Sequence, residues 1–434
     1  MHLILLAALA ADWPQWRGPA RDGVWPEKGV LARFPKDGPV KLWTAPVAGG
    51  YAGPAVAGGK VYVPDFATKG DVKKQSEPPR PDKALAGKER LLCLDARTGK
   101  QLWKHEYGIE ARVSYPTGPR ATPTVEGGRV YGLGMVGNLY CLDAETGKPV
   151  WQKDLVKEYE VEVPIWGFCS HPLVAGDKLY VLVGAKGGLC VCFDKKTGKE
   201  LWKALDGPEP GYSTPALVEE GGKKRLLVFH PEGVASLDPE TGKAGWSVEV
   251  EPLYKMSIMA PVKSGDLLFA GGIGNRSVML ELGGDKPKVL WRGKEGMRGK
   301  PMTGTGFGPV NMTPMLEGDV LYGVDQPGTF LAVDAKTGKR LWHTFKPTTG
   351  EKEVGSGTAF LIKNGDRHFL FSEKGELVIA KLSREKYEEI DRAKLVAPTS
   401  HAFGRNVVWT HPAFADKCVF VRNDKELACF SLAE

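Results

Sequence analysis

The side chains best suited to bind a ligand are scattered along the chain and form no catalytic motif. Arg120, Arg276 and Arg405 could hold an anionic group through paired hydrogen bonds. Trp166 and Trp409 could stack on a planar or sugar-like ligand. The sequence shows no nucleophile elbow, paired carboxylates, Walker loop, HExxH pair or EF-hand loop. These residues therefore predict binding, and we expect no catalytic residue and no metal ligand.

Two histidines have a position that allows two interpretations. His171 and His411 each precede a proline, where other segments of the chain carry threonine. Each imidazole either forms a hydrogen bond across neighbouring strands, as threonine would, or faces a ligand; the first interpretation is favoured because it needs no ligand. The predicted ligand funnel comprises Tyr115, Arg120, Trp166, His171, Asn311, Arg405, Asn406, Trp409 and His411.

An internal repeat determines the elements that must position these residues. The pattern D-x-x-T-G-K-x-x-W occurs five times, and a period of this kind indicates a repeat architecture. Its defining residues are Asp95, Gly99 and Trp103; Asp143, Gly147 and Trp151; Asp194, Gly198 and Trp202; Asp238, Gly242 and Trp246; and Asp334, Gly338 and Trp342. Trp291 keeps the tryptophan in a unit without the turn sequence.

The motif can be explained without a ligand. An aspartate at the start of a tight turn can accept hydrogen bonds from the turn amides, and glycine adopts the left-handed conformation that other residues resist. The lysine would be a solvated charge on an edge strand. The tryptophan is interpreted as a wedge that buries its ring against the next unit. The repeated motif therefore predicts architecture more strongly than binding.

Each unit also contains a small or polar residue, a proline and a β-rich run. The prolines are Pro54, Pro123, Pro172, Pro215, Pro261, Pro314 and Pro412, with Ala359 in the eighth such position. Eight four-stranded units predict an all-β, eight-bladed β-propeller of antiparallel blades, with a stacked solenoid as the poorer alternative. Residues from about 40 to 47 resemble the last strand of a unit without its other three strands. Residues from about 425 to 432 resemble the third strand of a unit that lacks its last strand. Pairing of these two segments would close the ring.

The predicted organisation has three parts and three irregular regions. Residues 1–11 are a signal peptide, 12–38 an N-terminal extension, and 39–434 a single propeller. Residues 66–90 form a charged insertion in the first blade, expected to be a mobile loop. The fifth unit replaces the turn motif by GGDKPKVLW. The seventh ends in LSREKYEEIDRAKL, where Tyr387 or Ile390 would replace the wedge.

The first residues predict export. Leu3 to Ala10 are apolar, and Ala8-Leu9-Ala10 fits a signal-peptidase site; the alternative is a frayed or buried N-terminal strand. A bilayer span needs about 20 apolar residues, so no transmembrane segment is expected. The expected location is the periplasm or the exterior of a bacterial cell.

The charge distribution argues against a nucleic-acid-binding protein, and the cysteine positions argue against a fold held by disulfides. The net charge is +7, and the lysines are scattered through TGK turns, so nucleic acid is not an expected partner. Cys93, Cys141 and Cys192 each stand two residues before a repeat aspartate. Equivalent positions in successive units are too far apart for a disulfide, which requires Cα atoms within about 7 Å. These cysteines are expected to be small buried side chains of the core. Separately, the chain is expected to be a monomer.

With its turn-and-tryptophan motif, the chain resembles the pyrroloquinoline-quinone (PQQ) type propeller repeats of quinoprotein alcohol dehydrogenases and BamB-like proteins. The segment DWPQWRGPARDG, from Asp12 to Gly23, is similar to the opening of a group of exported bacterial PQQ-like repeat proteins. The resemblance implies the propeller fold. It also implies, for the dehydrogenases, adjacent cysteines above the cofactor, a carboxylate base and a calcium site. This sequence has no Cys-Cys pair, and no base or calcium cluster matches.

Two functions follow as expectations. The first is a non-catalytic exported scaffold that binds a protein or carbohydrate partner of the cell envelope through its loops, with no cofactor. The alternative is a quinoprotein dehydrogenase that uses PQQ and calcium to oxidise an alcohol or a sugar.

Overall fold

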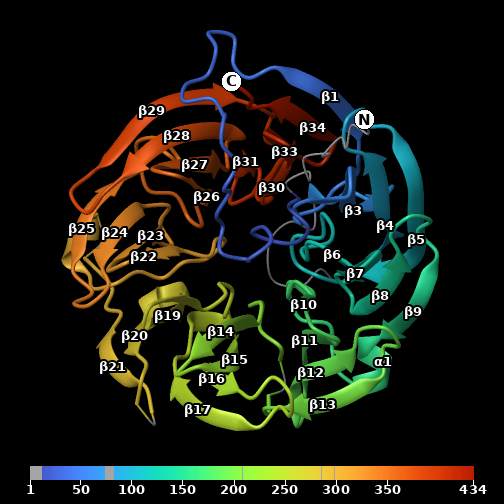
Figure 1. The fold of residues 1–434 in the computed structure, drawn as a ribbon, viewed down its shortest axis with the longest axis horizontal. Coiled ribbons are helices and arrows are strands. Elements are labelled where there is room, and N and C mark those ends of the chain that lie inside the picture. Colours follow the sequence, from blue (N-terminus) through green and yellow to red (C-terminus); the bar gives the residue numbers. More distant parts are fainter. Residues whose placement is uncertain (1–11, 74–82, 208, 285, 298) are drawn as a thin grey trace, which may run out of the picture.

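Eight four-stranded antiparallel sheets surround a central axis in the computed structural model, as Figure 1 shows. The structure describes residues 12–73, 83–207, 209–284, 286–297 and 299–434. The signal peptide predicted at residues 1–11 lies outside these residues. The predicted all-β, eight-bladed propeller is confirmed.

The blades follow one another along the chain. The first four consist of β2 (Ala55–Ala57), β3 (Lys60–Thr68), β4 (Leu85–Asp95) and β5 (Gln101–Ala111); β6 (Thr124–Glu126), β7 (Arg129–Leu133), β8 (Asn138–Asp143) and β9 (Pro149–Asp154); β10 (Leu173–Ala175), β11 (Lys178–Ala185), β12 (Gly188–Asp194) and β13 (Glu200–Ala204); and β14 (Ala216–Glu220), β15 (Lys223–His230), β16 (Gly233–Leu237) and β17 (Ala244–Glu249). The helix α1 (Leu155–Tyr159) follows the second blade.

The last four blades complete the ring. They consist of β18 (Val262–Ser264), β19 (Leu267–Gly272), β20 (Arg276–Glu281) and β21 (Lys288–Arg292); β22 (Met315–Glu317), β23 (Val320–Val324), β24 (Phe330–Asp334) and β25 (Arg340–Thr344); β26 (Ala359–Asn364), β27 (Arg367–Ser372), β28 (Glu376–Leu382) and β29 (Tyr387–Lys394); and β32 (Ala413–Ala415), β33 (Cys418–Arg422), β34 (Glu426–Ser431) and β1 (Lys41–Pro46). A separate hairpin of β30 (Ser400–Ala402) and β31 (Arg405–Val407) precedes the eighth blade.

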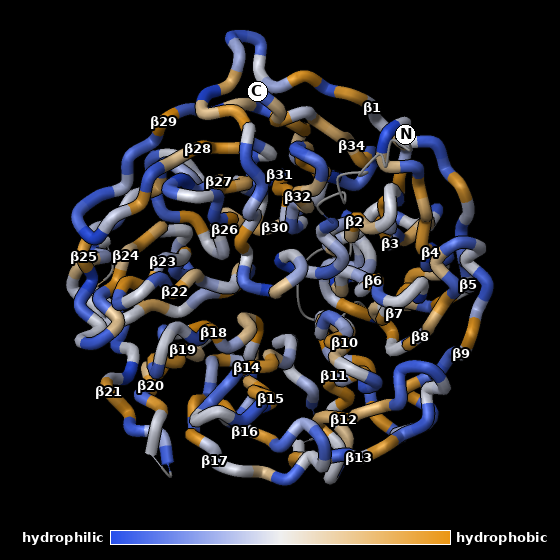
Figure 2. The backbone as a smooth tube through the Cα atoms, in the orientation of Figure 1, coloured by the Kyte–Doolittle hydropathy of each residue, from blue (hydrophilic) through white to orange (hydrophobic). Residues whose placement is uncertain are grey.

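The middle strands are apolar because neighbouring blades cover both of their faces. In β12, for example, the five residues from Leu189 to Phe193 are all fully buried. Figure 2 shows hydrophobic stretches within the blades and hydrophilic turns between them. Burial on both faces makes the hydrophobic effect the main force that holds each blade to the next.

The D-x-x-T-G-K turns have the predicted structure. Asp143 accepts hydrogen bonds at one carboxylate oxygen from the amides of Glu145 and Thr146, at 3.2 and 3.0 Å. Gly147 has φ +69°, and a Cβ there would lie 2.5 Å from the ring of Trp103. Both backbone conformation and space therefore require glycine. The threonine amide binds the aspartate in all five copies, at 2.8–3.0 Å.

Each tryptophan wedge joins its blade to the following one. Trp103 donates from Nε1 to the carbonyl oxygen of Ala144 at 3.1 Å, and Trp151 donates to that of Lys195 at 3.0 Å. Both acceptors directly follow the aspartate of the next turn. Equivalent bonds join Trp43 to Ala96, Trp202 to Pro239, and Trp291 to Ala335. Trp246 is the exception: it binds Glu220 of its own blade at 3.0 Å, because the fifth blade has no aspartate turn.

The seventh blade keeps the docking site in another form. Trp342 donates to the carbonyl oxygen of Ser383 at 2.9 Å, and the Ser383 hydroxyl accepts from the amides of Glu385 and Lys386. Serine therefore replaces the aspartate of the turn. The ring of Tyr387 lies 6.4 Å from that of Trp342, so it faces the sixth blade and is not the wedge towards the eighth.

The N-terminal extension packs against β29, the outer strand of the seventh blade. Ile390 packs against the core and accepts a hydrogen bond at its carbonyl oxygen from Arg33. Asp391 accepts one from the amide of Phe34, whose ring packs against the same core. The extension thus adds the aromatic ring of Phe34 to the core beside β29.

The ring closes as predicted, through pairing of β1 with β34. The register runs from Lys41 opposite Phe430 to Pro46 opposite Glu426. Arg422, which is fully buried, donates to the carbonyl oxygens of Pro64 and Ala48. The first and last blades are therefore joined both by a strand and by a buried guanidinium.

Both ends of the insertion at residues 66–90 are strand, whereas its middle, residues 69–84, connects them. The strands β3, β4 and β5 are extended outward, with Thr68 opposite Gly87 and Leu85 opposite Ala111. The loop predicted there is therefore confined to the connection between β3 and β4, of which residues 74–82 lie outside the described residues.

Residues 12–27, here named the channel segment, lie at the centre of the ring (Figure 1). Trp13 exchanges two backbone hydrogen bonds of 2.8 Å with Val56 of β2, and Trp25 donates one to Lys363 of β26. Trp13, Trp16 and Trp25 are 2%, 5% and 1% exposed. Its two ends lie at the far ends of inner strands, where Asp12 accepts from the Gly58 amide and Glu27 accepts from Asn364. Its middle lies at the start of the inner strands, where Arg17 and Arg21 donate to the carbonyl oxygens of Pro314 and Pro172.

Candidate functional site

An aromatic cluster lies on the loop face, which is the end of the propeller where the inner strands begin. This loop-face cluster consists of Tyr51, Tyr115, Trp166, Phe403 and Trp409, packed around Ala402 and Val407. The rings of Tyr115 and Phe403 are 6.2 Å apart, and each lies 6.2 Å from Trp409. Phe403 is at the tip of the β30–β31 hairpin and is 51% exposed.

A buried carboxylate holds this cluster. Glu373 is 3% exposed and accepts two hydrogen bonds from Arg405, at 2.8 and 3.0 Å. It also accepts one from Trp409 Nε1 at 3.2 Å. Arg405 is thus paired and is not available to clamp an anion. Glu373 could not be identified from the sequence, because it stands in an unremarkable SEKG turn.

Arg120 is likewise occupied. Its guanidinium donates to the carbonyl oxygens of Ser114, Tyr115 and Gly118 at 2.5–2.9 Å, and it lies 5.1 Å from the Tyr51 ring. Arginine bound in this way fixes the loop from Ser114 to Gly118 under the aromatic rings. Two of the three predicted anion-binding arginines therefore have structural contacts, and the third, Arg276, is exposed at the start of β20.

Trp166 and the two asparagines occupy different places on this face. Trp166 packs edge-on against Tyr212, with ring centroids 5.5 Å apart. Asn406 is exposed beside the hairpin tip, whereas Asn311 donates to the carbonyl oxygen of Ser356 at 3.3 Å. The structure thus brings together Tyr115, Trp166, Arg405, Asn406 and Trp409, and leaves Asn311 outside the cluster.

His171 and His411 lie outside the loop-face cluster, around Trp16 at the tip of the channel segment. His171 accepts a hydrogen bond at Nδ1 from the Thr122 amide at 2.8 Å. Trp16 stacks on His171 with centroids 4.7 Å apart and packs edge-on against His411 at 5.7 Å. Both imidazoles therefore contact this chain's own tryptophan. No pattern in the sequence predicts this contact, because the N-terminal extension carries no copy of the repeat.

Burial lowers the pKa of both imidazoles. The pKa of His411 falls to about 3, mainly because the ring is removed from water and secondarily because Arg17 is near. The pKa of His171 also falls well below its ordinary value, through burial, His411 and Arg21. Both histidines are therefore neutral at physiological pH.

Stability should consequently fall in mild acid. The unfolded chain binds the His411 proton with a pKa near 6.5, whereas the folded chain does so only near pH 3. The contribution of His411 is fully present above pH 6.5 and declines as the pH falls below it. We expect the free energy of unfolding, measured with urea, to drop by about 2 kcal/mol from pH 7 to pH 5 on account of His411. His411→Asn should show a smaller drop, and an equal drop would contradict the assignment.

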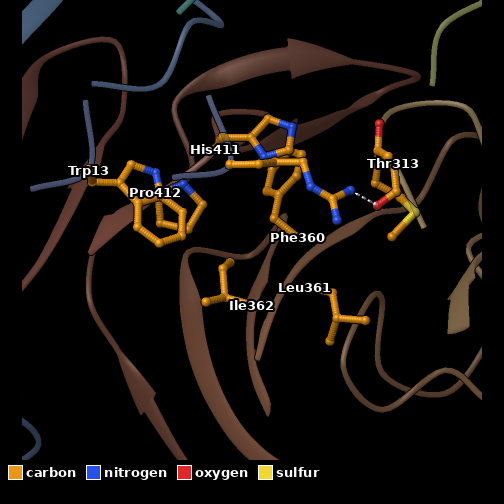
Figure 3. A pocket seen from close by; sticks show the side chains of 9 residues that line it. Trp13, Thr313, Phe360, Leu361, Ile362, His411 and Pro412 are labelled. Atoms are coloured by element: carbon orange, nitrogen blue, oxygen red, sulfur yellow. Dashed lines mark hydrogen bonds between the residues drawn. The ribbon is translucent and has the colours of Figure 1, made fainter. Parts of the chain in front are cut away.

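The channel does not fit the cofactor that quinoproteins bind. A cavity beside the channel segment is lined by Trp13, Arg17, Thr313, Phe360 and His411 among others (Figure 3). Its volume is about 10 Å³, whereas ligand sites commonly have about 300 Å³ or more. PQQ is a rigid tricyclic tricarboxylate, so it could enter only if the segment left. Within the described residues, no group of three or more His, Cys, Asp or Glu side chains could hold a metal ion.

The fold and the docking turns define the chain as a PQQ-like repeat propeller. A family model described as outer membrane protein assembly factor BamB matches residues 87–344 and 231–434. Since these ranges cover most of the sequence, the chain belongs to this family. No curated protein matches the sequence.

Solved structures agree on the fold. BamB from Moraxella catarrhalis is 14% identical, with a TM-score of 0.56, and the match covers 90% of this chain and 97% of that one. Quinohemoprotein alcohol dehydrogenase from Comamonas testosteroni is 15% identical, with a TM-score of 0.61 and coverage of 98% and 81%. The designed protein Ika8 is 12% identical, with a TM-score of 0.52 and coverage of 90% and 99%. At these identities the likeness concerns the fold alone.

No helix in the described part of the chain is both long and apolar enough to cross a membrane.

Proposed function

We propose that this chain is a non-catalytic, exported scaffold of the bacterial cell envelope that binds a protein through the loop-face cluster. The observation that carries the proposal is the packed aromatic group on one face, in which Phe403 is exposed, Trp166 and Trp409 are partly exposed, and Tyr115 is buried. Tryptophan, tyrosine and arginine are the residues that most often dominate protein–protein binding energy.

The arrangement of the cluster favours a protein over a carbohydrate. Sugar sites combine an aromatic ring face with free polar groups that hydrogen-bond the hydroxyls. Here the rings pack against one another at tilted or edge-on angles, and Arg120 and Arg405 are already bound within the chain. A rigid aromatic surface with paired polar groups needs little ordering when a partner binds, which lowers the cost of association.

The family supports the location and the mode of action. Its description names an outer membrane assembly factor, and the predicted signal at residues 1–11 agrees with export. The filled channel supports the non-catalytic assignment, because Trp13, Trp16 and Arg17 occupy the axis. The partner would be a protein of the envelope, bound by a single copy of this chain.

Site-specific photo-cross-linking tests the proposal. A benzophenone side chain at Phe403, which is 51% exposed, is compared with one at Leu102 on the outer strand β5, which is 48% exposed. In envelope preparations we expect a discrete protein adduct from position 403 and none from 102. The adduct should weaken at least about tenfold when Trp409→Ala is added, a loss that corresponds to 1.4 kcal/mol or more. Equal adducts at both positions would overturn the proposal.

A further inference from the structure

The channel segment buries Arg17 and partly buries Arg21, both without a carboxylate partner. Arg17 is 6% exposed and donates only to backbone carbonyl oxygens, those of Thr313, Pro314 and Asp22. Arg21 donates to the carbonyl oxygens of His171 and Pro172. Among the described residues, neither arginine forms an ion pair with an acidic side chain.

The surroundings add little negative charge. Both guanidinium groups lie near the Trp16 ring, at 5.6 and 6.0 Å from its centroid. The neighbouring histidines are neutral, as shown above. The acid that acts on Arg17 electrostatically is Asp22, which is exposed and accepts a hydrogen bond from the Val24 amide. The burial of the Arg17 cation, with a second and partly buried cation nearby, is unfavourable unless a counter-charge is supplied.

Donor groups in this region also lack acceptors. The Nε atoms of Arg17 and Arg21 and the Nε1 atom of Trp16 are buried without a hydrogen-bond partner. A buried donor without an acceptor costs about 1–3 kcal/mol. The cavity described above is lined by the polar side chains of Arg17, His411 and Thr313 and by apolar side chains that include Phe360 and Ile362. Figure 3 shows Phe360 beside His411, with Thr313 and Ile362 further apart. At about 10 Å³, the cavity has the room that one water molecule needs. A halide ion is somewhat larger than water, so its entry requires a small outward shift of the lining side chains.

We infer that the cavity beside Arg17 is a binding site for a small monovalent anion of the halide class. The guanidinium supplies charge and hydrogen-bond donors. The apolar wall suits a weakly hydrated ion such as chloride and disfavours phosphate, which requires several polar contacts. The site lies inside the ring, so it is separate from the loop-face cluster, and its failure would leave the proposed function unaffected.

Thermal unfolding of the full chain provides the first test. Chloride is titrated against gluconate at constant ionic strength, so that general screening does not change. We expect a saturable rise in Tm of about 2 °C or more with chloride. The rise should be absent in Arg17→Gln and retained in Arg33→Gln, a control arginine that is exposed on the same extension. No chloride-specific rise in the unmodified chain would overturn the inference.

A crystal soaked in bromide provides a test that does not depend on the folding of a variant. The inference predicts an anomalous peak within hydrogen-bond distance of the Arg17 guanidinium. A cavity that contains only water, without an anomalous signal, would overturn it. A bromide that remains in the cavity of an Arg17→Gln crystal would show that the arginine does not hold the ion and would equally overturn it.

Discussion

Trp16→Ala is expected to lower the free energy of unfolding by about 3–5 kcal/mol, the usual range for removal of a buried tryptophan. The side chain is 5% exposed and stacks on His171. Its loss would leave a void at the axis and would remove the ring that lies beside both Arg17 and Arg21. Equilibrium unfolding in urea, followed by circular dichroism, measures the change.

Two further variants define what this result means. Trp16→Phe keeps a ring beside His171 and should cost less than alanine. Pro19→Ala changes an exposed residue at the tip of the same segment and should be nearly neutral. If Trp16→Ala unfolds with the same midpoint and slope as the parent chain, the channel segment does not contribute to the fold as described.

Trp151→Ala is expected to produce a loss of similar size, about 3–5 kcal/mol. This wedge packs against the turn of the third blade, near Gly198, and donates to the carbonyl oxygen of Lys195 at 3.0 Å. Because blades contact only their neighbours, the substitution should loosen one boundary of the ring. Calorimetry would show a lower Tm, and hydrogen exchange would show faster exchange in β9 and in β10 to β13.

Val150 provides the matched control for this wedge. It directly precedes Trp151, sits at the β-bulge of the same strand, and is 44% exposed. Val150→Ala should change stability by less than about 1 kcal/mol. Equal losses at positions 150 and 151 would show that the outer strand as a whole, and not the tryptophan, holds the two blades together.

The regular part of the fold was predictable because its signals are local and repeated. Asp143, Gly147 and Trp151 each have a defined role within one turn and one strand, and five copies of that pattern exclude coincidence. The closure of the ring was predictable for the same reason. The strand that contains Trp43 resembles the last strand of a blade but is not preceded by a D-x-x-T-G-K turn, so its partner strand had to come from elsewhere in the chain. Ser383 was missed because its SREK turn has neither threonine nor glycine.

The candidate site was less predictable because distant contacts determine it. Nothing periodic in the sequence places Trp16 between His171 and His411, which are about 155 and 395 residues away in the chain. Glu373 likewise acquires its role only because the fold brings Arg405 and Trp409 to it. The funnel was expected as an open ligand site, whereas the structure has a filled axis and an aromatic surface above it.

The chain fills its own channel with residues 12–27, and we propose that it recognises its partner on the loop face. The most direct test is a titration of the full chain with PQQ and calcium, followed by cofactor absorbance and dye reduction with alcohols and sugars. We predict no saturable absorbance change and no turnover, because Trp13, Trp16 and Arg17 occupy the axis. Saturable binding accompanied by dye reduction would contradict the claim.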